Sequence, residues 1–343
     1  MRSERFQHGG NVYAHPGCVD FSANLNPLGM PSGVREALCN SVDAFAQYPD
    51  PACFALTEAL AAFEEVPREW VLACAGATDA FARVCAVVRP ARGMVFAPCY
   101  SGYEQALEQA GARVWQNEVG FVKSGLDIFD KTAAELVFIA NPNNPTGQCV
   151  ERVTLVAFLE QAQDRGATVV LDECFIDLTS RERSNDLLRR FGNLIIVKAF
   201  TKSFALAGLR LGYLLCSDAV MIERLRAAGQ PWAVSVPAQI AGVACVEADK
   251  QERYIQRSKQ LVAQERERLH AALLSFGLRV VPSDANFLLF EGPKGLYEAM
   301  LERGILIRPC DNYRGLSERW YRIAVRTPQE NTLLMRAMEE VLR

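Results

Sequence analysis

The sequence predicts an α/β fold: a mostly parallel sheet with helices on both faces, followed by a smaller α+β domain. Apolar runs of strand length alternate with helical patterns between residues 71 and 216, which is typical of consecutive βαβ units. From about Pro237 this alternation gives way to a long amphipathic helical pattern with a charged middle. We therefore expect a large domain at residues 31–235, and a small domain with an N-terminal arm at residues 1–30 and 236–343.

Each element follows from a local pattern of apolar residues. Six buried strands of the large domain are expected at residues 71–75, 94–97, 136–140, 168–172, 194–200 and 211–216. Helices between them are expected at residues 78–88, 101–111 and 153–166. In the small domain we expect a helix at 247–276, strands at 279–281, 286–290 and 320–325, and helices at 295–303 and at the C-terminus. Ligands of such folds bind at the carboxyl ends of the strands.

Composition excludes several classes of function. The 343 residues are 50% hydrophobic and 22% charged, which is enough apolar surface for a large core. A net charge of -3 gives no broad basic field, so we expect no nucleic-acid or membrane partner. The 11 cysteines form no C-x2-C pair and the three histidines have no metal-ligand spacing, so we expect reduced thiols and no metal. With no signal-peptide pattern and no membrane-length apolar run, the expected location is the cytoplasm.

The most informative stretch is AFTKSFALAGLRLGY, residues 199–213. It places Lys202 and, eight positions later, Arg210 on one turn between two expected strands. A desolvated lysine amine can form an imine with an aldehyde, and an arginine can hold a phosphate. An isolated pair with this spacing is also compatible with two solvated surface charges. Pyridoxal 5'-phosphate carries both an aldehyde and a phosphate, and is therefore the candidate cofactor.

Three further strand ends offer polar groups at the same edge of the sheet. Small residues at 74–77 precede Thr78, so backbone N–H groups and the Thr78 hydroxyl could hold a phosphate, although a plain helix cap fits too. The turn NPNNPTG at 141–147 offers the Asn144 side chain. Asp172 ends a buried strand, where a carboxylate needs a partner. That partner could be a protonated pyridine nitrogen, or a backbone N–H group of a helix or loop that Asp172 caps.

Together these stretches resemble the fold-type-I, pyridoxal-phosphate-dependent enzymes of the aminotransferase class I/II superfamily. NPNNPTG, LDE and AFTKSFALAGLRLGY occur in the family's order, with 28 residues from Asn144 to Asp172 and 30 from Asp172 to Lys202. The likeness extends from HGGN at 8–11 to YRIAVRTPQEN at 321–331. It implies a mostly parallel, seven-stranded sheet.

The resemblance implies a role for each matched residue. Lys202 would form the imine with the cofactor, Asp172 would keep the pyridine nitrogen protonated, Asn144 would donate to the ring hydroxyl, and Tyr100 would stack on the ring. The catalytic residues would be Lys202, Asp172 and Tyr100. The cofactor phosphate would be bound by Ala77, Thr78, Thr201 and Arg210, and Gly76 would be a further cofactor-binding residue.

Two more assignments and one departure follow from the same resemblance. Tyr48, in QYPDP, would reach the phosphate of the neighbouring subunit's cofactor, which implies a homodimer. Arg322 would bind the acid group of the substrate. Many relatives have tyrosine where this chain has Phe175, so a donor to the ring hydroxyl is absent and Asn144 is the expected side-chain donor.

Two groups within the superfamily share these features. Histidinol-phosphate aminotransferases resemble the chain in the N-x-N-P-x-G pattern that runs from Asn24 to Gly29 and in YPDP. Threonine-phosphate decarboxylases of cobalamin biosynthesis are more specifically similar in HGGN, DFSANLNPLG, Phe175 and the ending R-x-A-V-R-T. The second group implies substrate contacts from His8, Asn24, Asn144, Arg322 and Arg326. Arg322 and Arg326 would lie roughly 13 Å apart along a strand, so both can contact one ligand only if their side chains lean together.

The expected function is decarboxylation of O-phospho-L-threonine to (R)-1-aminopropan-2-yl phosphate for the corrinoid nucleotide loop. Transamination of histidinol phosphate or a related amino acid is the alternative, because the same residues serve both reactions and only the placement of the substrate selects between them. A pyridoxal-phosphate-binding protein without turnover is a second alternative. The set of Lys202, Asp172 and Asn144 argues against it, because binding alone does not require an electron sink.

Overall fold

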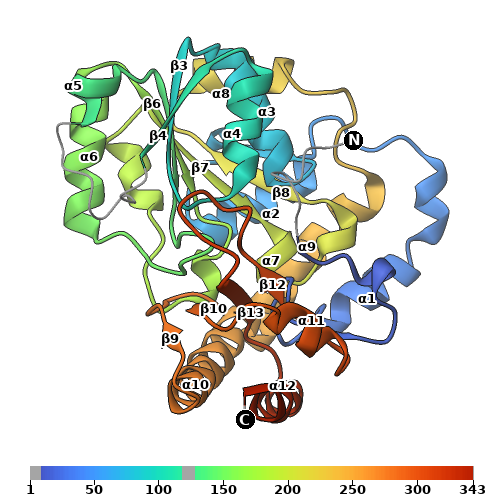
Figure 1. Cartoon of the computed structure of the whole chain (residues 1–343). Coiled ribbons are helices and arrows are strands. Elements are labelled where there is room, and N and C mark those ends of the chain that lie inside the picture. The colour runs from blue at the N-terminus through green and yellow to red at the C-terminus, as the bar shows by residue number, and fades with distance from the viewer. Residues whose placement is uncertain (1–8, 118–127, 343) are drawn as a thin grey trace.

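The central feature of the fold is a seven-stranded sheet with strand order β2-β8-β7-β6-β5-β3-β4 (Figure 1). The computed structural model describes residues 9–117 and 128–342. The strands are β2 (Val71–Cys74), β3 (Arg92–Phe96), β4 (Arg113–Asn117), β5 (Leu136–Ala140), β6 (Thr168–Asp172), β7 (Leu194–Ala199) and β8 (Gly212–Leu215). Neighbouring strands from β4 to β7 pair in parallel, whereas β8 is antiparallel to both β7 and β2. The predicted α/β fold with a mostly parallel sheet is confirmed.

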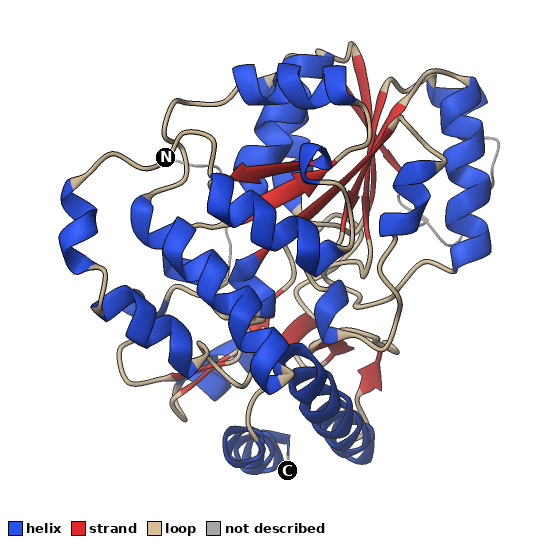
Figure 2. Ribbon diagram, turned by 180° about the vertical axis from the view of Figure 1, so that it is seen from behind, coloured by secondary structure: helices blue, strands red, loops and turns tan. Residues whose placement is uncertain are grey.

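Alternating side chains of each strand enter two separate cores. Val137 and Ile139 of β5 face one core, while Leu136 and Phe138 face the other, and all four are buried. Burying a side chain of this size contributes about 1.5–3 kcal/mol, so both faces must be covered. Figure 2 shows from behind the helices that cover one side of the sheet. The helices that line the two cores are α2 (Phe54–Glu64), α6 (Arg152–Asp164) and α9 (Val236–Glu252) on the first, and α3 (Ala77–Val88), α4 (Ser101–Gln109) and α8 (Ala219–Ala227) on the second.

The small sheet has the order β12-β13-β10-β9 and lies between the central sheet and two outer helices in Figure 1. Its strands are antiparallel to their neighbours. The elements are α10 (Tyr254–Ser275), β9 (Arg279–Val280), β10 (Phe287–Glu291), α11 (Leu296–Leu301), β11 (Ile305–Leu306), β12 (Arg308–Pro309), β13 (Trp320–Ala324) and α12 (Pro328–Leu342). The N-terminal segment joins this region because β1 (Val19–Asp20) pairs in parallel with β11. The domain boundaries given above stay a prediction.

Two expectations from the sequence are wrong in detail. Strand β4 was not among the six expected strands, because its side chains are only partly buried and include polar residues, so no apolar run marks it. The single helix expected at 247–276 is two helices, α9 and α10, which meet at Arg253. Arg253 has φ 51°, a left-handed conformation that interrupts an α-helix.

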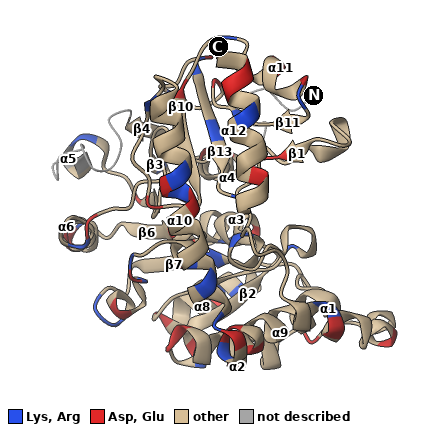
Figure 3. Ribbon diagram, turned by 90° about the horizontal axis from the view of Figure 1, so that it is seen from below, with Lys and Arg blue, Asp and Glu red and all other residues tan. Residues whose placement is uncertain are grey.

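The remaining described helices are short or peripheral: α1 (Ser32–Cys39), α5 (Ile128–Thr132) and α7 (Phe200–Ser203). Lys, Arg, Asp and Glu are interspersed along the outer helices rather than gathered by sign (Figure 3). In the described part of the chain, no helix combines the length and the apolar character needed to cross a membrane. The described residues also hold no group of three or more His, Cys, Asp or Glu side chains placed to bind a metal ion.

Candidate active site

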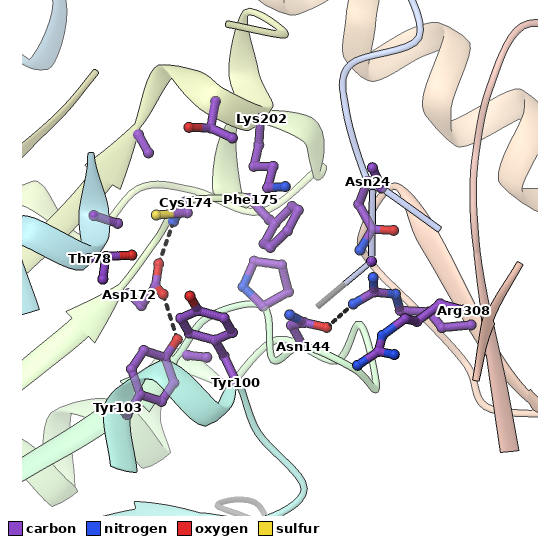
Figure 4. A pocket seen from close by; sticks show the side chains of 18 of the residues that line it. Asn24, Thr78, Tyr100, Tyr103, Asn144, Asp172, Cys174, Phe175, Lys202 and Arg308 are labelled. Carbon is purple, nitrogen blue, oxygen red and sulfur yellow. Dashed lines mark hydrogen bonds between the residues drawn. The ribbon is translucent and has the colours of Figure 1, made fainter. Parts of the chain in front are cut away.

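A cavity of about 270 Å³ lies where the carboxyl ends of the central strands meet the small sheet (Figure 4). Large-domain strand ends, the N-terminal segment and the small sheet all contribute side chains to it. Ten of the residues predicted for the site line it: Asn24, Ala77, Thr78, Tyr100, Asn144, Asp172, Thr201, Lys202, Arg210 and Arg322. The structure therefore brings these ten residues together at one cavity, and the role of each residue stays a prediction.

Lys202 lies on α7, the one-turn helix that follows the fully buried strand β7. Burial is the largest of the causes that lower the pKa of Lys202 to about 8, and the charges of Arg322 and Arg210 act in the same direction. The Nζ atom lies 5.6 Å from the centroid of the Phe175 ring. A lysine held in this environment carries an unprotonated, nucleophilic amine in a substantial fraction of molecules near neutral pH.

Asp172 ends β6 and is held by two donors. The Tyr103 hydroxyl donates to Oδ2 at 2.5 Å, and the Cys174 backbone N–H donates to Oδ1 at 2.9 Å (Figure 4). Burial raises the pKa of Asp172, while the hydrogen bonds from Cys174 and Tyr103 and the charge of Lys202 oppose that rise. Such a carboxylate is suited to pair with a cation inside the cavity, as the predicted role requires.

Tyr103 is a site residue that the sequence analysis missed. Its side chain is buried, stacks on Phe138 at 5.2 Å and meets Phe81 edge-on at 5.1 Å. These contacts fix the hydroxyl against Asp172. The only local signal is that Tyr103 follows Tyr100 by three positions, which places both at the start of the same helix.

The N-terminus of α3 forms a cradle for an anion together with Arg210. The first N–H groups of an α-helix lack intrahelical acceptors and the helix dipole favours negative charge there. Gly76, the residue before α3, has φ 87°, and a Cβ at this position would lie 3.0 Å from Nη2 of Arg210. A side chain at Gly212 would meet the backbone N of Ala77 at 2.9 Å. Both glycines therefore keep the cradle open.

Tyr100 stands beside this cradle. Burial raises the pKa of its hydroxyl, and a hydrogen bond with the Thr78 side chain opposes the rise. A Cβ at Gly102 would lie 2.2 Å from the Tyr100 ring, so the position of that ring depends on glycine two residues later. Figure 4 shows the Tyr100 ring at the cavity wall formed by Asp172 and Tyr103.

Asn144 joins the large domain to the small sheet. Its Oδ1 accepts hydrogen bonds from Nη1 of Arg322 and from the Tyr313 hydroxyl, the latter at 3.3 Å. An amide that accepts through its oxygen presents its Nδ2 as a donor, which is the role predicted for a ring hydroxyl. Arg322 also donates through Nη2 to the Ser22 carbonyl at 2.9 Å.

A third arginine of the cavity comes from the strand next to β13. Arg308 of β12 is the direct register partner of Arg322 of β13, and both line the cavity although they are buried. Arg308 donates to Asn312 at 2.8 Å. The sequence analysis paired Arg322 with Arg326 and missed Arg308, because a cross-strand pair fourteen residues apart leaves no local pattern.

Two of the other predicted residues, Arg326 and Tyr48, do not line the cavity. Arg326 follows the end of β13 and donates to the Asp20 carbonyl at 2.9 Å and to Glu330 at 2.6 Å. Its contact with substrate stays a prediction. Tyr48 is 80% exposed and packs on Trp232, with ring centroids 4.7 Å apart. His8 lies outside the described residues.

The cavity fits pyridoxal 5'-phosphate, the predicted cofactor. Lys202 would meet its aldehyde, Asp172 its ring nitrogen, and the α3 cradle with Arg210 its phosphate. Asn24 also lines the cavity, and its buried Oδ1 accepts no hydrogen bond from residues 9–117 and 128–342. A polar ligand in the cavity could donate to this oxygen. Bound there, the ring would act as an electron sink for a bond broken at the substrate Cα.

Comparison with known proteins agrees with this geometry. The family model for aminotransferase class I and II matches residues 16–338. The chain is 34% identical to the threonine-phosphate decarboxylase of Salmonella typhimurium, covering 98% of this chain and 96% of the relative. It is also 34% identical to histidinol-phosphate aminotransferase 2 of Ralstonia nicotianae, covering 94% and 88%. The solved histidinol-phosphate aminotransferase of Clostridium acetobutylicum superposes with a TM-score of 0.86 at 25% identity, over 94% of this chain and 98% of that one.

The order of motifs, the fold and the contents of the cavity thus lead to one conclusion: the chain belongs to the aminotransferase class I and II family.

Proposed function

We propose that the chain is a pyridoxal-phosphate-dependent decarboxylase that converts O-phospho-L-threonine to (R)-1-aminopropan-2-yl phosphate. The observation that carries the proposal is the cross-strand pair of Arg308 and Arg322 opposite Lys202 in one cavity. Two arginines suit a substrate with two anionic groups, a carboxylate and a phosphate. Histidinol phosphate carries a phosphate but no carboxylate.

The residues would select decarboxylation by placing the substrate. An arginine would hold the phosphate of the substrate, which would leave the carboxylate free to depart. The bound cofactor would supply the electron sink for the bond from Cα to the carboxylate, so that CO₂ leaves. Lys202, or a water molecule, would deliver to Cα the proton that replaces CO₂. Asp172 would stabilise the positive charge of the ring nitrogen through its carboxylate.

The alternative is transamination of histidinol phosphate or a related amino acid. It is favoured by the equal identity to the aminotransferase of Ralstonia nicotianae, and it uses the same Lys202 and Asp172. In that reaction an arginine would hold the phosphate of histidinol phosphate, or the carboxylate of an amino acid, and Lys202 would remove the proton from Cα. The two reactions differ in what Arg308 and Arg322 hold, which the residues alone do not decide.

The two reactions are separated by one incubation. The protein, loaded with pyridoxal 5'-phosphate, is mixed with O-phospho-L-threonine in the absence of an oxo acid, and CO₂ and the visible spectrum are followed. Sustained release of CO₂ with an unchanged cofactor spectrum supports the decarboxylase. A single turnover that stops as pyridoxamine phosphate and restarts with an oxo acid would refute it in favour of the aminotransferase. A Lys202→Ala variant is the control and should release no CO₂.

We also propose that the protein acts as a homodimer in the cytoplasm, with product entering the corrinoid nucleotide loop. The exposed ring pair of Tyr48 and Trp232 supports the dimer, since Tyr48 does not line the cavity of its own chain.

Mixing Tyr48→Phe and Lys202→Ala subunits tests the proposed dimer. In a mixed dimer, the site that contains Lys202 would receive Tyr48 from its partner, so activity should exceed that of either parent variant. No gain on mixing would contradict this arrangement.

A further inference from the structure

Asn26 is a buried polar residue that the proposed chemistry does not use. It lies two positions after the cavity residue Asn24, in the N-x-N-P-x-G stretch, and only 3% of its surface is exposed. The Asn26 side chain does not line the cavity. Both hydrogens on Nδ2 and the Oδ1 atom of its amide nevertheless have hydrogen-bond partners, which indicates a role outside direct contact with a ligand.

The principal partner of Asn26 is the backbone of α7 (Phe200–Ser203), which carries Lys202 and is called the lysine turn below. The Asn26 backbone N–H donates to the Lys202 carbonyl at 3.1 Å, and its Nδ2 donates to the Ser203 carbonyl at 2.7 Å. Both carbonyl groups lie in the last residues of α7, where a helix leaves its carbonyls without intrahelical donors. Asn26 thus supplies two donors to the turn that carries the reactive amine.

The same amide ties this turn to the small domain. The second hydrogen on Nδ2 reaches Oγ of Ser258 on α10 at 2.7 Å, and Ser258 is fully buried. The Asn26 Oδ1 accepts from the Leu28 N–H at 3.0 Å, which closes a local turn. The Asn26 side chain therefore connects α7 at Ser203, α10 at Ser258 and the N-terminal segment at Leu28.

The opposite side of the turn is fixed separately. The Ser203 hydroxyl donates to Oδ2 of the buried Asp177 at 3.1 Å. Asp177 in turn accepts from Arg183 at 2.8 Å. With this side held by the large domain, Asn26 decides how α7 sits relative to the N-terminal segment and the small domain.

We propose that Asn26 is a positioning residue for Lys202: it caps the carbonyl groups of the lysine turn and links them to Ser258 and to the segment that carries Asn24. The proposal rests on Lys202 binding the cofactor, but holds whether decarboxylation or transamination follows. It predicts that the amine of Lys202 keeps its buried position only while this cap is intact.

The pH dependence of cofactor uptake by Lys202 is a measurement that general destabilisation of the fold does not shift. The titratable and charged groups that face Lys202 are Arg322, Arg210, Cys174, Asp172 and Asp20. Burial is the largest cause of its lowered pKa, to about 8. Uptake of pyridoxal 5'-phosphate by the cofactor-free protein needs the neutral amine, so its rate should rise with pH around this value. A loosened turn would let water reach the amine, and the midpoint would move to higher pH.

The test variant is Asn26→Ser. Its hydroxyl can still accept from the Leu28 N–H, but its shorter side chain does not reach the Ser203 carbonyl. We expect the rate constant for cofactor uptake near pH 8 to fall at least about 10-fold, since displacement of a reacting group by about 1 Å has effects of this order or larger. We also expect the pH midpoint of uptake to rise.

Asn286→Ala is the matched control. Asn286 is a fully buried asparagine whose Nδ2 donates to the Leu25 carbonyl at 3.1 Å, so it supports the same segment without contacting the lysine turn. Its loss should lower the melting temperature but leave the midpoint of uptake in place. A wild-type rate and midpoint in Asn26→Ser would overturn the proposal, as would an equal shift in Asn286→Ala.

If Asn26→Ser does not fold, as judged by circular dichroism, Ser258→Ala takes its place. That variant keeps Asn26 and removes one of its anchors, so a smaller rise of the midpoint is expected and an unchanged midpoint would overturn the proposal. Failure of the proposed function looks different, because the cofactor would then be taken up normally while O-phospho-L-threonine releases no CO₂.

Discussion

Removing the hydroxyl of Tyr103 tests how the protein keeps Asp172 charged in a buried site. Tyr103→Phe deletes the 2.5 Å hydrogen bond to Oδ2 of Asp172 and leaves the Cys174 N–H on Oδ1. The ring contacts with Phe138 and Phe81 can persist, since phenylalanine keeps the same aromatic ring. The change is therefore confined to one donor.

The size of the effect follows from that donor. A hydrogen bond to a charged group contributes about 1.5–3 kcal/mol. Burial already raises the pKa of Asp172, and loss of the Tyr103 donor raises it further, which favours the neutral acid over the carboxylate. A neutral acid stabilises a protonated ring nitrogen less. If the whole contribution reached the transition state, kcat would fall by about 10- to 150-fold, and we expect at least 10-fold.

The assay combines kcat with a direct reading of the ring nitrogen. Pyridoxal 5'-phosphate labelled with ¹⁵N reports the protonation of that nitrogen by its chemical shift, which should move toward the neutral form in Tyr103→Phe. Tyr213→Phe is the matched control, because Tyr213 is also buried and donates to a buried carboxylate, Glu64, outside the cavity. An unchanged ¹⁵N shift together with kcat within twofold of wild type would refute the reasoning.

Three further changes have defined outcomes. Arg308→Ala should raise KM for O-phospho-L-threonine at least about 10-fold, because a charge-assisted contact with an anionic group is lost. Gly102→Ala should displace the Tyr100 ring, which would lie 2.2 Å from the new Cβ, and so weaken cofactor binding measured by absorbance titration. Lys198→Met should lower the free energy of unfolding in urea by about 3 kcal/mol, because it leaves Glu64, now paired at 2.7 Å, as a buried charge without this partner.

Each of these changes has a control elsewhere in the chain. Arg279→Ala removes an arginine with a 75% exposed side chain and should leave KM unchanged. Gly192→Ala adds a Cβ with no atom of the described residues within 4 Å and should leave cofactor binding unchanged. Lys294→Met removes an ion pair with the exposed Glu318 and should leave the free energy of unfolding unchanged. A control that behaves like its test variant would contradict the corresponding argument.

The parts of the fold that the sequence predicts are those with a local apolar pattern. Strand β6 reads TVVLD and strand β7 is buried along its whole length, so both stand out as apolar runs that end in a polar residue or a turn. Strand β4 alternates exposed and partly buried residues, and its pairing with β3 decides its structure. The break between α9 and α10 at Arg253 occurs within a continuous helical pattern, and no glycine or proline near it indicates that a helix ends there.

The same distinction separates the site residues. Asn144, Asp172 and Lys202 each follow a predicted strand, so the parallel sheet brings them to one edge. Arg308 reaches the cavity through the pairing of β12 with β13, and Asn26 reaches the backbone of α7 through a long-range contact of the N-terminal segment. Neither contact has a local signature in the sequence. Propensity and spacing therefore find residues on the central sheet, and miss those that come from the small sheet and the N-terminal segment.

The charges of the cavity connect the state of Lys202 to the ligands that it would serve. In the structure, Arg210 and Arg322 add to the burial that holds the pKa of Lys202 near 8, which keeps a neutral amine available for the cofactor aldehyde. A cofactor phosphate at Arg210 and a substrate anion at Arg322 would neutralise both guanidinium charges. Their repulsion of a proton on Lys202 would then fall, and the pKa of the released amine would rise. The same side chain would thus be a nucleophile before the ligands bind and a better proton carrier once both are in place, which is the order in which a decarboxylase or an aminotransferase needs the two properties.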